Sequence, residues 1–175
     1  MKVKRWRQFP VISLAAEHLV VGSLMRRNIL AYKAPPRNAG YDLICIHPDP
    51  TKSGEQIRVQ VKSRYQTDCD RAFPVKEKSF DSFDYLIIVF LNNGFYYKKN
   101  QAILNGYREP EFYTLPTEFI RDNHYKTPSG WEKVLTKNLE MENFKNEKGF
   151  EIIAKDLGIP YPGEEYDSWL RSQSR

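Results

Sequence analysis

The stretch YDLICIHPDPTKSGEQIRVQVKSRY, residues 41–65, contains two apolar segments separated by a turn with Pro and Gly. The first segment is apolar on both faces after Asp42, as expected of a central strand that is covered on both sides. The second segment, residues 56–65, alternates between two faces, with Ile57, Val59 and Val61 on one and Arg58, Gln60 and Lys62 on the other. We therefore predict two strands that carry polar residues within an otherwise apolar sheet.

A helix is predicted before these strands, from about Ser13 to Asn28, with Ser13 as its N-cap. Its apolar stripe recurs at helical spacing and consists of Leu14, Val20, Val21 and Leu24. Glu17 lies in the middle of this stripe. A carboxylate on an apolar face is costly unless it has a partner or a ligand, so Glu17 is a candidate site residue.

The remaining elements follow from apolar patterning and from Pro, Gly and Asn in the turns. We predict further strands at residues 29–34, 71–76, 85–91, 95–99 and 111–116, a helical turn at 117–122 and a terminal helix at 143–157. No repeat or linker divides the sequence. We therefore expect one domain over residues 1–175, with a motif-bearing core at about 13–120 and a C-terminal helix and tail at about 140–175.

Positive charge is concentrated in the first third of the chain. Residues 1–64 contain twelve Lys and Arg against four Asp and Glu, a balance of +8, whereas residues 65–175 contain fifteen against eighteen, a balance of −3. A basic field of this kind attracts polyanions, so nucleic acid is the favoured partner.

The sequence argues against a membrane protein and against a zinc or disulfide framework. No stretch approaches the roughly 18 to 20 apolar residues of a membrane helix, and Glu17 and His18 interrupt the apolar run that follows the basic N-terminus. We therefore expect a cytoplasmic protein with no membrane partner. Cys45 and Cys69 have no CxxC spacing and are interpreted as core residues.

The order of these features resembles the PD-(D/E)xK nuclease superfamily. Its pattern is an acid on a first helix, an acid at the start of one strand of a hairpin, and (D/E/Q)-x-K on the partner strand. The block YDLI followed by RVQVKSR is most similar to small intron-encoded homing endonucleases that carry Gln-x-Lys, and more loosely to Holliday-junction resolvases. The resemblance covers about residues 13–65. It implies an α/β restriction-endonuclease-like fold, a mixed β-sheet flanked by helices, and Mg²⁺-dependent hydrolysis of phosphodiester bonds in DNA.

The resemblance also assigns roles to residues. Mg²⁺ prefers hard oxygen ligands, and strands about 4.8 Å apart would let Asp42 and Gln60 share one ion, with Mn²⁺ as an alternative metal. The Val61 carbonyl would add a ligand, and Glu17 would complete the site directly or through a water. Lys62 would stabilise charge on the phosphate or orient the attacking water. The candidates for phosphate contacts are Arg37, Asn38, Ser63 and Arg64.

Other interpretations stay open at this point. Gln60 and Lys62 could be exposed residues of an amphipathic strand, and Asp42 after Gly40 could be a turn residue. Gln60 also removes one negative charge relative to the usual acid, and residues 66–83 lack the helix that the superfamily has before its next strand. The alternatives in function are a catalytically inactive nucleic-acid-binding or interaction module with the same fold, and an RNA-directed nuclease. Cutting two strands needs two active sites, so we expect a homodimer or homotetramer.

Overall fold

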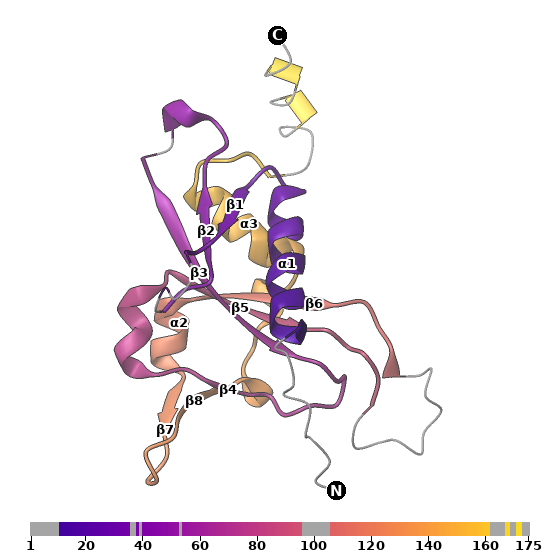
Figure 1. Ribbon diagram of the computed structural model, residues 1–175, viewed down its shortest axis with the longest axis vertical. Coiled ribbons are helices and arrows are strands. Elements are labelled where there is room, and N and C mark those ends of the chain that lie inside the picture. Colours follow the sequence, from indigo (N-terminus) through magenta and orange to yellow (C-terminus); the bar gives the residue numbers. More distant parts are fainter. Residues whose placement is uncertain are drawn as a thin grey trace, which may run out of the picture.

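The computed structural model describes residues 11–35, 38, 40–52, 54–95, 106–161, 167–168 and 171–172. A mixed sheet of five strands runs in the order β1-β2-β3-β5-β6 (Figure 1). The strands are β1 (Leu30–Lys33), β2 (Leu43–Ile46), β3 (Gln56–Arg64), β5 (Tyr85–Phe90) and β6 (Glu111–Pro116). β3 is central and the longest, so it positions the residues on both of its faces.

The pairing of β3 differs on its two sides. β1, β2 and β3 form an antiparallel meander, whereas β3 and β5 run parallel with Val59 opposite Tyr85. A parallel pair needs a crossover, and residues 65–84 provide it. The crossover contains β4 (Ala72–Pro74) and the 3-10 helix η2 (Glu77–Ser82). As the sequence predicted, residues 66–83, all of them described, contain no α-helix.

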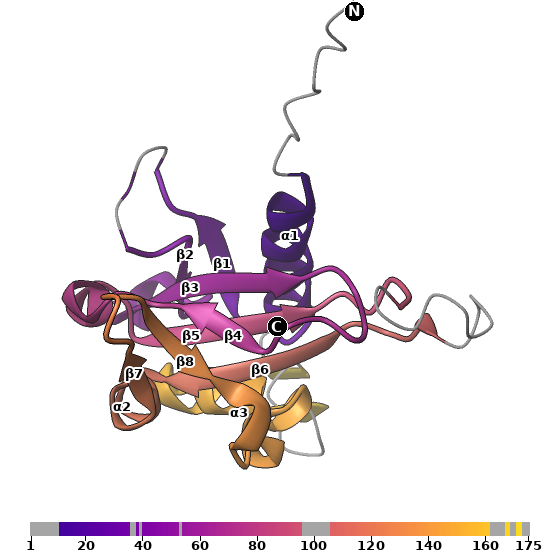
Figure 2. The same ribbon diagram turned by 90° about the horizontal axis from the view of Figure 1, so that it is seen from below.

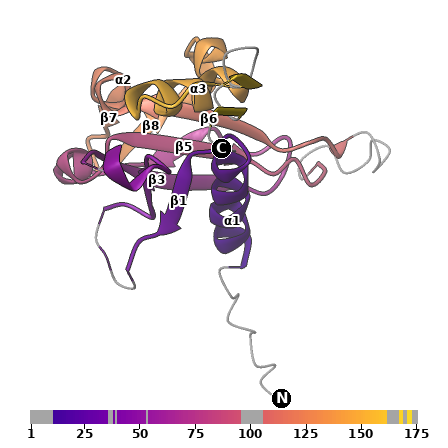
Figure 3. The same cartoon turned by 90° about the horizontal axis from the view of Figure 1, so that it is seen from above.

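One face of the sheet is covered by two helices. α1 (Val11–Met25) contacts β1 and β3, and α3 (Glu147–Asp156) contacts β6. Figures 2 and 3 show α1 at the β1–β3 end of the sheet and α3 at the β6 end. The apolar residues of β3 belong to the core cluster beneath both helices, which includes Val20, Leu24, Val59, Ile87, Phe150 and Ile153. The alternation of β3 therefore sends Arg58, Gln60 and Lys62 to the opposite face.

The opposite face carries a second core cluster and a smaller sheet. β4 pairs with β8 (Glu132–Leu135), which pairs with β7 (His124–Lys126), and α2 (Thr117–Asp122) follows β6. The apolar side chains of β5 that point this way pack with residues of β4, η2 and β8, namely Phe73, Val75, Phe80, Leu86, Ile88, Phe90 and Val134. β3 thus has a helical layer on one side and the crossover on the other.

Most predicted helices and strands are present, but some end at other residues, or bury other side chains, than the sequence predicted. The first helix has already begun at Val11, so Ser13 is not its N-cap, and Leu14 is exposed rather than part of the core. The helix ends before Asn28, whose left-handed φ of 60° lets the Ile29 amide reach the Leu24 carbonyl. The buried stripe is Ala16, Val20 and Leu24. Glu17 is therefore at the edge of the stripe and not in its middle.

Two strands were not predicted. β7 and β8 have few apolar residues, and they form because β8 pairs with both β4 and β7. The predicted terminal helix at 143–157 shortens to Glu147–Asp156, since Glu142–Phe144 forms a separate 3-10 turn. Most of the predicted 95–99 strand lies outside the described residues. No helix within the described ranges is long and apolar enough to span a bilayer.

Alanine substitutions at two helical glycines test this packing, because we expect them to change the free energy of unfolding in opposite directions. A Cβ on Gly149 would overlap the Phe144 carbonyl oxygen and lie 2.9 Å from Thr114 Oγ1, whereas a Cβ on Gly22 would meet nothing within 4 Å. We expect Gly149→Ala to lower the free energy of unfolding by about 1 to 3 kcal/mol. Gly22→Ala should raise it by about 0.5 to 1 kcal/mol, because alanine is the better helix former. Urea unfolding of both variants checks the pair, and equal effects would contradict the described packing of α3.

Candidate active site

Asp42 closes the β2–β3 ladder with its side chain. Its backbone amide donates to the Val59 carbonyl at 2.8 Å, in continuation of the ladder. The next amide of β3 on that side, Val61 N–H, donates to the Asp42 carboxylate oxygen Oδ2 at 2.7 Å instead of to a backbone carbonyl. The two strands therefore separate at this point. The second carboxylate oxygen, Oδ1, accepts no hydrogen bond from the described residues.

Strand geometry also sets the direction of the Val61 carbonyl. The Arg58 and Arg64 carbonyls accept from Asp84 and Leu91, on the β5 side of β3, so even-numbered residues of β3 bond toward β5. Val61 therefore directs both its N–H and its C=O toward β2. The gap beside Asp42 is thus lined by a free carboxylate oxygen and by the backbone of Val61.

The charge state of Asp42 depends on several neighbours. Burial is the largest influence and raises the pKa of Asp42 above its ordinary value, while the hydrogen bond from Val61 lowers it. The Glu17 carboxylate raises the pKa further, and the Lys62 and Lys33 ammonium groups lower it. Asp42 is therefore electrostatically coupled to Glu17 and to Lys62, which come from opposite faces of the sheet.

Glu17 has a partner that the sequence did not suggest. Its carboxylate forms an ion pair with Lys33 at the end of β1, and its side chain is 18% exposed. This pair explains how a carboxylate is tolerated beside the buried stripe of α1. Glu17 lies on the α1 side of the sheet and acts on Asp42 through its charge.

Gln60 has an unsatisfied side-chain oxygen. The β2–β3 register ends at the pair Leu43–Val59, and Asp42 and Gln60 are the residues that flank this pair on the two strands. The Gln60 oxygen Oε1 is buried and has no hydrogen-bond partner. A buried amide oxygen without a donor costs free energy, and a cation would remove that cost.

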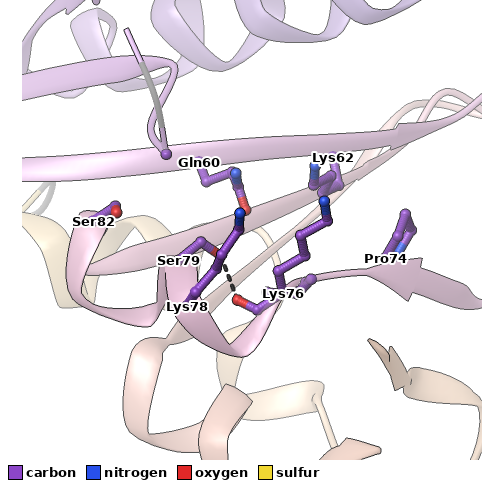
Figure 4. Close-up of a pocket in the computed structure, with 9 residues that line it drawn as sticks. Gln60, Lys62, Pro74, Lys76, Lys78, Ser79 and Ser82 are labelled. Carbon is purple, nitrogen blue, oxygen red and sulfur yellow. Dashed lines mark hydrogen bonds between the residues drawn. The ribbon is translucent and has the colours of Figure 1, made fainter. Parts of the chain in front are cut away.

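Gln60 and Lys62 line a pocket of about 410 Å³ between β3 and the crossover. Figure 4 shows both side chains leaving β3 toward the segment 74–82, from which Lys76 and Lys78 rise to meet them. The pocket is completed by Gly40, Pro74, Val75, Ser79 and Ser82. None of the described residues that line it is acidic.

Gly40 allows the loop before β2 to approach η2 closely, at one end of the pocket. Its φ is +105°, a conformation that favours glycine, and a Cβ there would overlap Ser82 Cβ. The loop before Asp42 therefore lies directly against η2.

The oxygen donors fit a divalent cation with hard-oxygen preference. Asp42 and the Val61 backbone lie at the gap between β2 and β3, and the Gln60 side chain leaves the neighbouring position of β3 toward the pocket. No three His, Cys, Asp or Glu side chains gather into a metal-binding group in the described part of the chain. A cation here would thus depend on one carboxylate, one amide and backbone oxygen, with the charge of Glu17 nearby.

The predicted phosphate contacts have different surroundings. Arg64 donates from Nε to the Asp70 carbonyl at 2.9 Å and from Nη2 to the Ala72 carbonyl, and it stacks on Phe73. These contacts hold the start of β4 against the end of β3. Ser63 is half-buried, Asn38 is exposed and donates to the Tyr41 carbonyl, and Arg37 lies outside the described residues. A phosphate contact by any of the four stays a prediction.

Three lysines near the site were not singled out from the sequence: Lys33, Lys76 and Lys78. The charge run in PVKEKSF was visible, but it lies in a segment without clear periodicity. Only the parallel pairing of β3 with β5 folds this segment over the polar face of β3.

Comparison with solved structures confirms the predicted fold. A bacterial homing endonuclease superposes with a TM-score of 0.50 at 14% sequence identity, over 86% of this chain and 94% of that chain. A Holliday junction resolvase from the archaeal hyperthermophile Archaeoglobus fulgidus gives a TM-score of 0.45 at 10% identity, over 86% of this chain and 99% of that chain. No protein-family model matches the chain, and no curated protein matches it. The likeness to the homing endonuclease shows a restriction-endonuclease-like fold and, at this identity, the fold alone.

The raised pKa of Asp42 predicts an effect on stability. A carboxyl group whose pKa is higher in the folded state binds its proton more tightly there, so its ionisation opposes folding once the pH rises above the unfolded pKa. We expect Asp42→Asn, which keeps an oxygen to accept from Val61, to be more stable than wild type at neutral pH in metal-free buffer. The difference should shrink as the pH falls below about 4. Thermal unfolding against pH checks this, and a less stable variant at neutral pH would contradict it.

Proposed function

We propose that this chain is a metal-dependent endonuclease that hydrolyses phosphodiester bonds in DNA, with Mg²⁺ as its cofactor and Mn²⁺ as an alternative. The observation that carries the proposal is the buried, unpartnered Gln60 oxygen on β3, one residue before Val61, whose amide donates to the Asp42 carboxylate. The restriction-endonuclease-like fold and the basic pocket beside these residues support it.

Each site residue has a role in the proposed reaction that follows from its chemistry. Asp42, Gln60 and the Val61 carbonyl would hold the ion, which when bound polarises a phosphate and lowers the pKa of a coordinated water. Lys62 lies two residues beyond Gln60 on the same face and would donate to a non-bridging phosphate oxygen or orient the attacking water. Glu17 would add negative charge to the site from the α1 side, directly or through a water. Lys33, which forms an ion pair with Glu17, would orient its carboxylate.

Self-association belongs to the proposal, because cleavage of a duplex needs two active sites. α1 exposes several apolar side chains on its outer surface, including Leu14, Leu19 and Met25. An apolar helix face of this kind is consistent with a homodimer or homotetramer. Sedimentation of the purified chain tests this part, and a monomer at micromolar concentration with undiminished duplex cleavage would contradict it.

Cleavage of supercoiled plasmid by the purified protein tests the activity. Wild type should cut in Mg²⁺ and not in EDTA. Asp42→Asn and Lys62→Ala should each reduce the rate by at least about 100-fold, since the first removes the anionic metal ligand and the second removes positive charge at the reacting phosphate. Lys148→Ala, an exposed lysine on α3, is the control and should cut at the wild-type rate.

The failing outcomes separate the alternatives. Binding of DNA without cutting in any divalent metal would favour the inactive binding module. Cutting of structured or single-stranded RNA in preference to DNA would favour the RNA-directed nuclease. Wild-type rates in Asp42→Asn or Lys62→Ala would overturn the site while leaving a nuclease activity to be assigned elsewhere.

The role of Gln60 has its own test. A neutral amide supplies an oxygen but no charge, so the free protein should bind Mg²⁺ weakly. Gln60→Glu should bind the metal more tightly, by about tenfold, since it adds a carboxylate at a partly desolvated site. Gln60→Leu removes the ligand and should cut DNA at least tenfold more slowly at low Mg²⁺, with partial recovery at high Mg²⁺.

Calorimetric titration of Mg²⁺ or Mn²⁺ into wild type and both variants, with cleavage rates across metal concentration, measures these effects. If Gln60→Leu binds metal and cuts like wild type, the amide oxygen is not a ligand. Far-ultraviolet circular dichroism of each variant controls for loss of the fold.

A further inference from the structure

Lys76 and Lys78 form the wall of the pocket that faces β3. Both are exposed and come from the crossover, outside the residues assigned to catalysis. Among the described residues, neither has a carboxylate within 4.0 Å, and the same holds for Lys62. Three ammonium groups therefore surround one pocket without a neutralising partner (Figure 4).

Two aspartates that follow in the crossover are held by arginines, and Glu77, between the two lysines, does not line the pocket. Asp81 pairs with Arg121 at 2.6 Å, and Asp84 pairs with Arg58 at 2.9 Å. The segment thus presents its positive charges to the pocket and its aspartates to other partners. The wall of the pocket that Lys76 and Lys78 form therefore attracts an anion.

The backbone that carries the two lysines is fixed before any ligand binds. The Glu77 amide donates to the Glu132 carboxylate of β8 at 2.6 Å, and Ser79 Oγ donates to the Lys76 carbonyl at 2.6 Å. Phe80 is buried and packs edge-on against His124. These contacts fix the backbone between and beside the two lysines. The loss of backbone entropy when an anion binds is therefore small.

We propose that Lys76 and Lys78 bind a backbone phosphate of the DNA that neighbours the scissile one, and so hold the cut strand between β3 and the crossover. The proposal rests on the DNA-acting role proposed above but does not require cleavage. Lys62 lines the same pocket from β3, beside Gln60. In the proposed function, Lys62 therefore contacts the reacting phosphate. The two crossover lysines approach from the opposite wall, and a continuous strand has further phosphates on either side of the reacting one.

DNA binding in EDTA, where no cleavage occurs, tests the proposal directly. Fluorescence anisotropy with a labelled DNA duplex gives the affinity of wild type and of Lys76→Gln/Lys78→Gln at several salt concentrations. We expect the double variant to bind about tenfold more weakly at low salt. The slope of log affinity against log salt should become shallower by about 0.9 for each phosphate that the variant no longer neutralises.

The matched control removes the same number of charges from the other face of the sheet. Lys148→Gln/Lys155→Gln changes two exposed lysines of α3 and should keep the wild-type slope. Lys76→Arg/Lys78→Arg retains the charges and should restore binding. Equal losses in the two glutamine variants, or no DNA binding by wild type, would overturn the proposal.

Cleavage kinetics separate this inference from the proposed function. If wild type cuts, Lys76→Gln/Lys78→Gln should raise KM with little change in kcat, unlike Lys62→Ala, which should lower kcat. If wild type binds DNA through the two lysines but never cuts, the phosphate site stands and the nuclease proposal fails. If wild type cuts and the double variant keeps the wild-type affinity and slope, the nuclease proposal stands and the phosphate site fails.

Discussion

The hydrogen bond from the Val61 amide to the Asp42 carboxylate ends the β2–β3 ladder, and the arrangement around the polar face of β3 depends on it. A backbone carbonyl in the same place would continue the ladder and close the gap. The carboxylate satisfies the amide with one oxygen and leaves the other open, so one residue terminates the strand pair and, in the proposed function, would provide a ligand. Gln60 precedes Val61 on β3, and Lys62 lies on the same face as Gln60 because strand side chains alternate.

Several charged side chains of the sheet and its helices form ion pairs, whereas Asp42 forms none in the described part of the chain. Away from the gap, Arg58 pairs with Asp84, Arg121 with Asp81, and Arg27 with Glu147. Beside the gap, the pKa of Asp42 is raised by burial, and the Gln60 oxygen has no donor. These features are individually unfavourable, and a cation with a phosphate would relieve them together.

The alternation of residues 56–64 predicted the face that Gln60 and Lys62 share, because a two-residue period has only one structural interpretation at that length. The resemblance of residues 13–65 to the PD-(D/E)xK pattern predicted the fold class, which the likeness to the homing endonuclease structure confirms. Sequence did not predict the pairing of Glu17 with Lys33, because it depends on how α1 packs over the end of β1. It also did not predict Lys76 and Lys78 as neighbours of Lys62, since thirteen residues separate Lys62 from Lys76 and only the β3–β5 crossover brings them together. β7 and β8 were missed because their pairing with each other and with β4, rather than apolar content, stabilises them.

The contact between Gly40 and Ser82 joins two parts of the chain that are distant in sequence. Gly40 has a backbone conformation and surroundings that leave no room for a Cβ, and Ser82 is the residue that a Cβ would meet. A larger residue at either position therefore requires a change at the other, or a shift of the crossover away from the strand that begins after Asp42. In an alignment of relatives that share this crossover, positions 40 and 82 should vary together, and a relative that loses the glycine should also have a different route between its third and fifth strands.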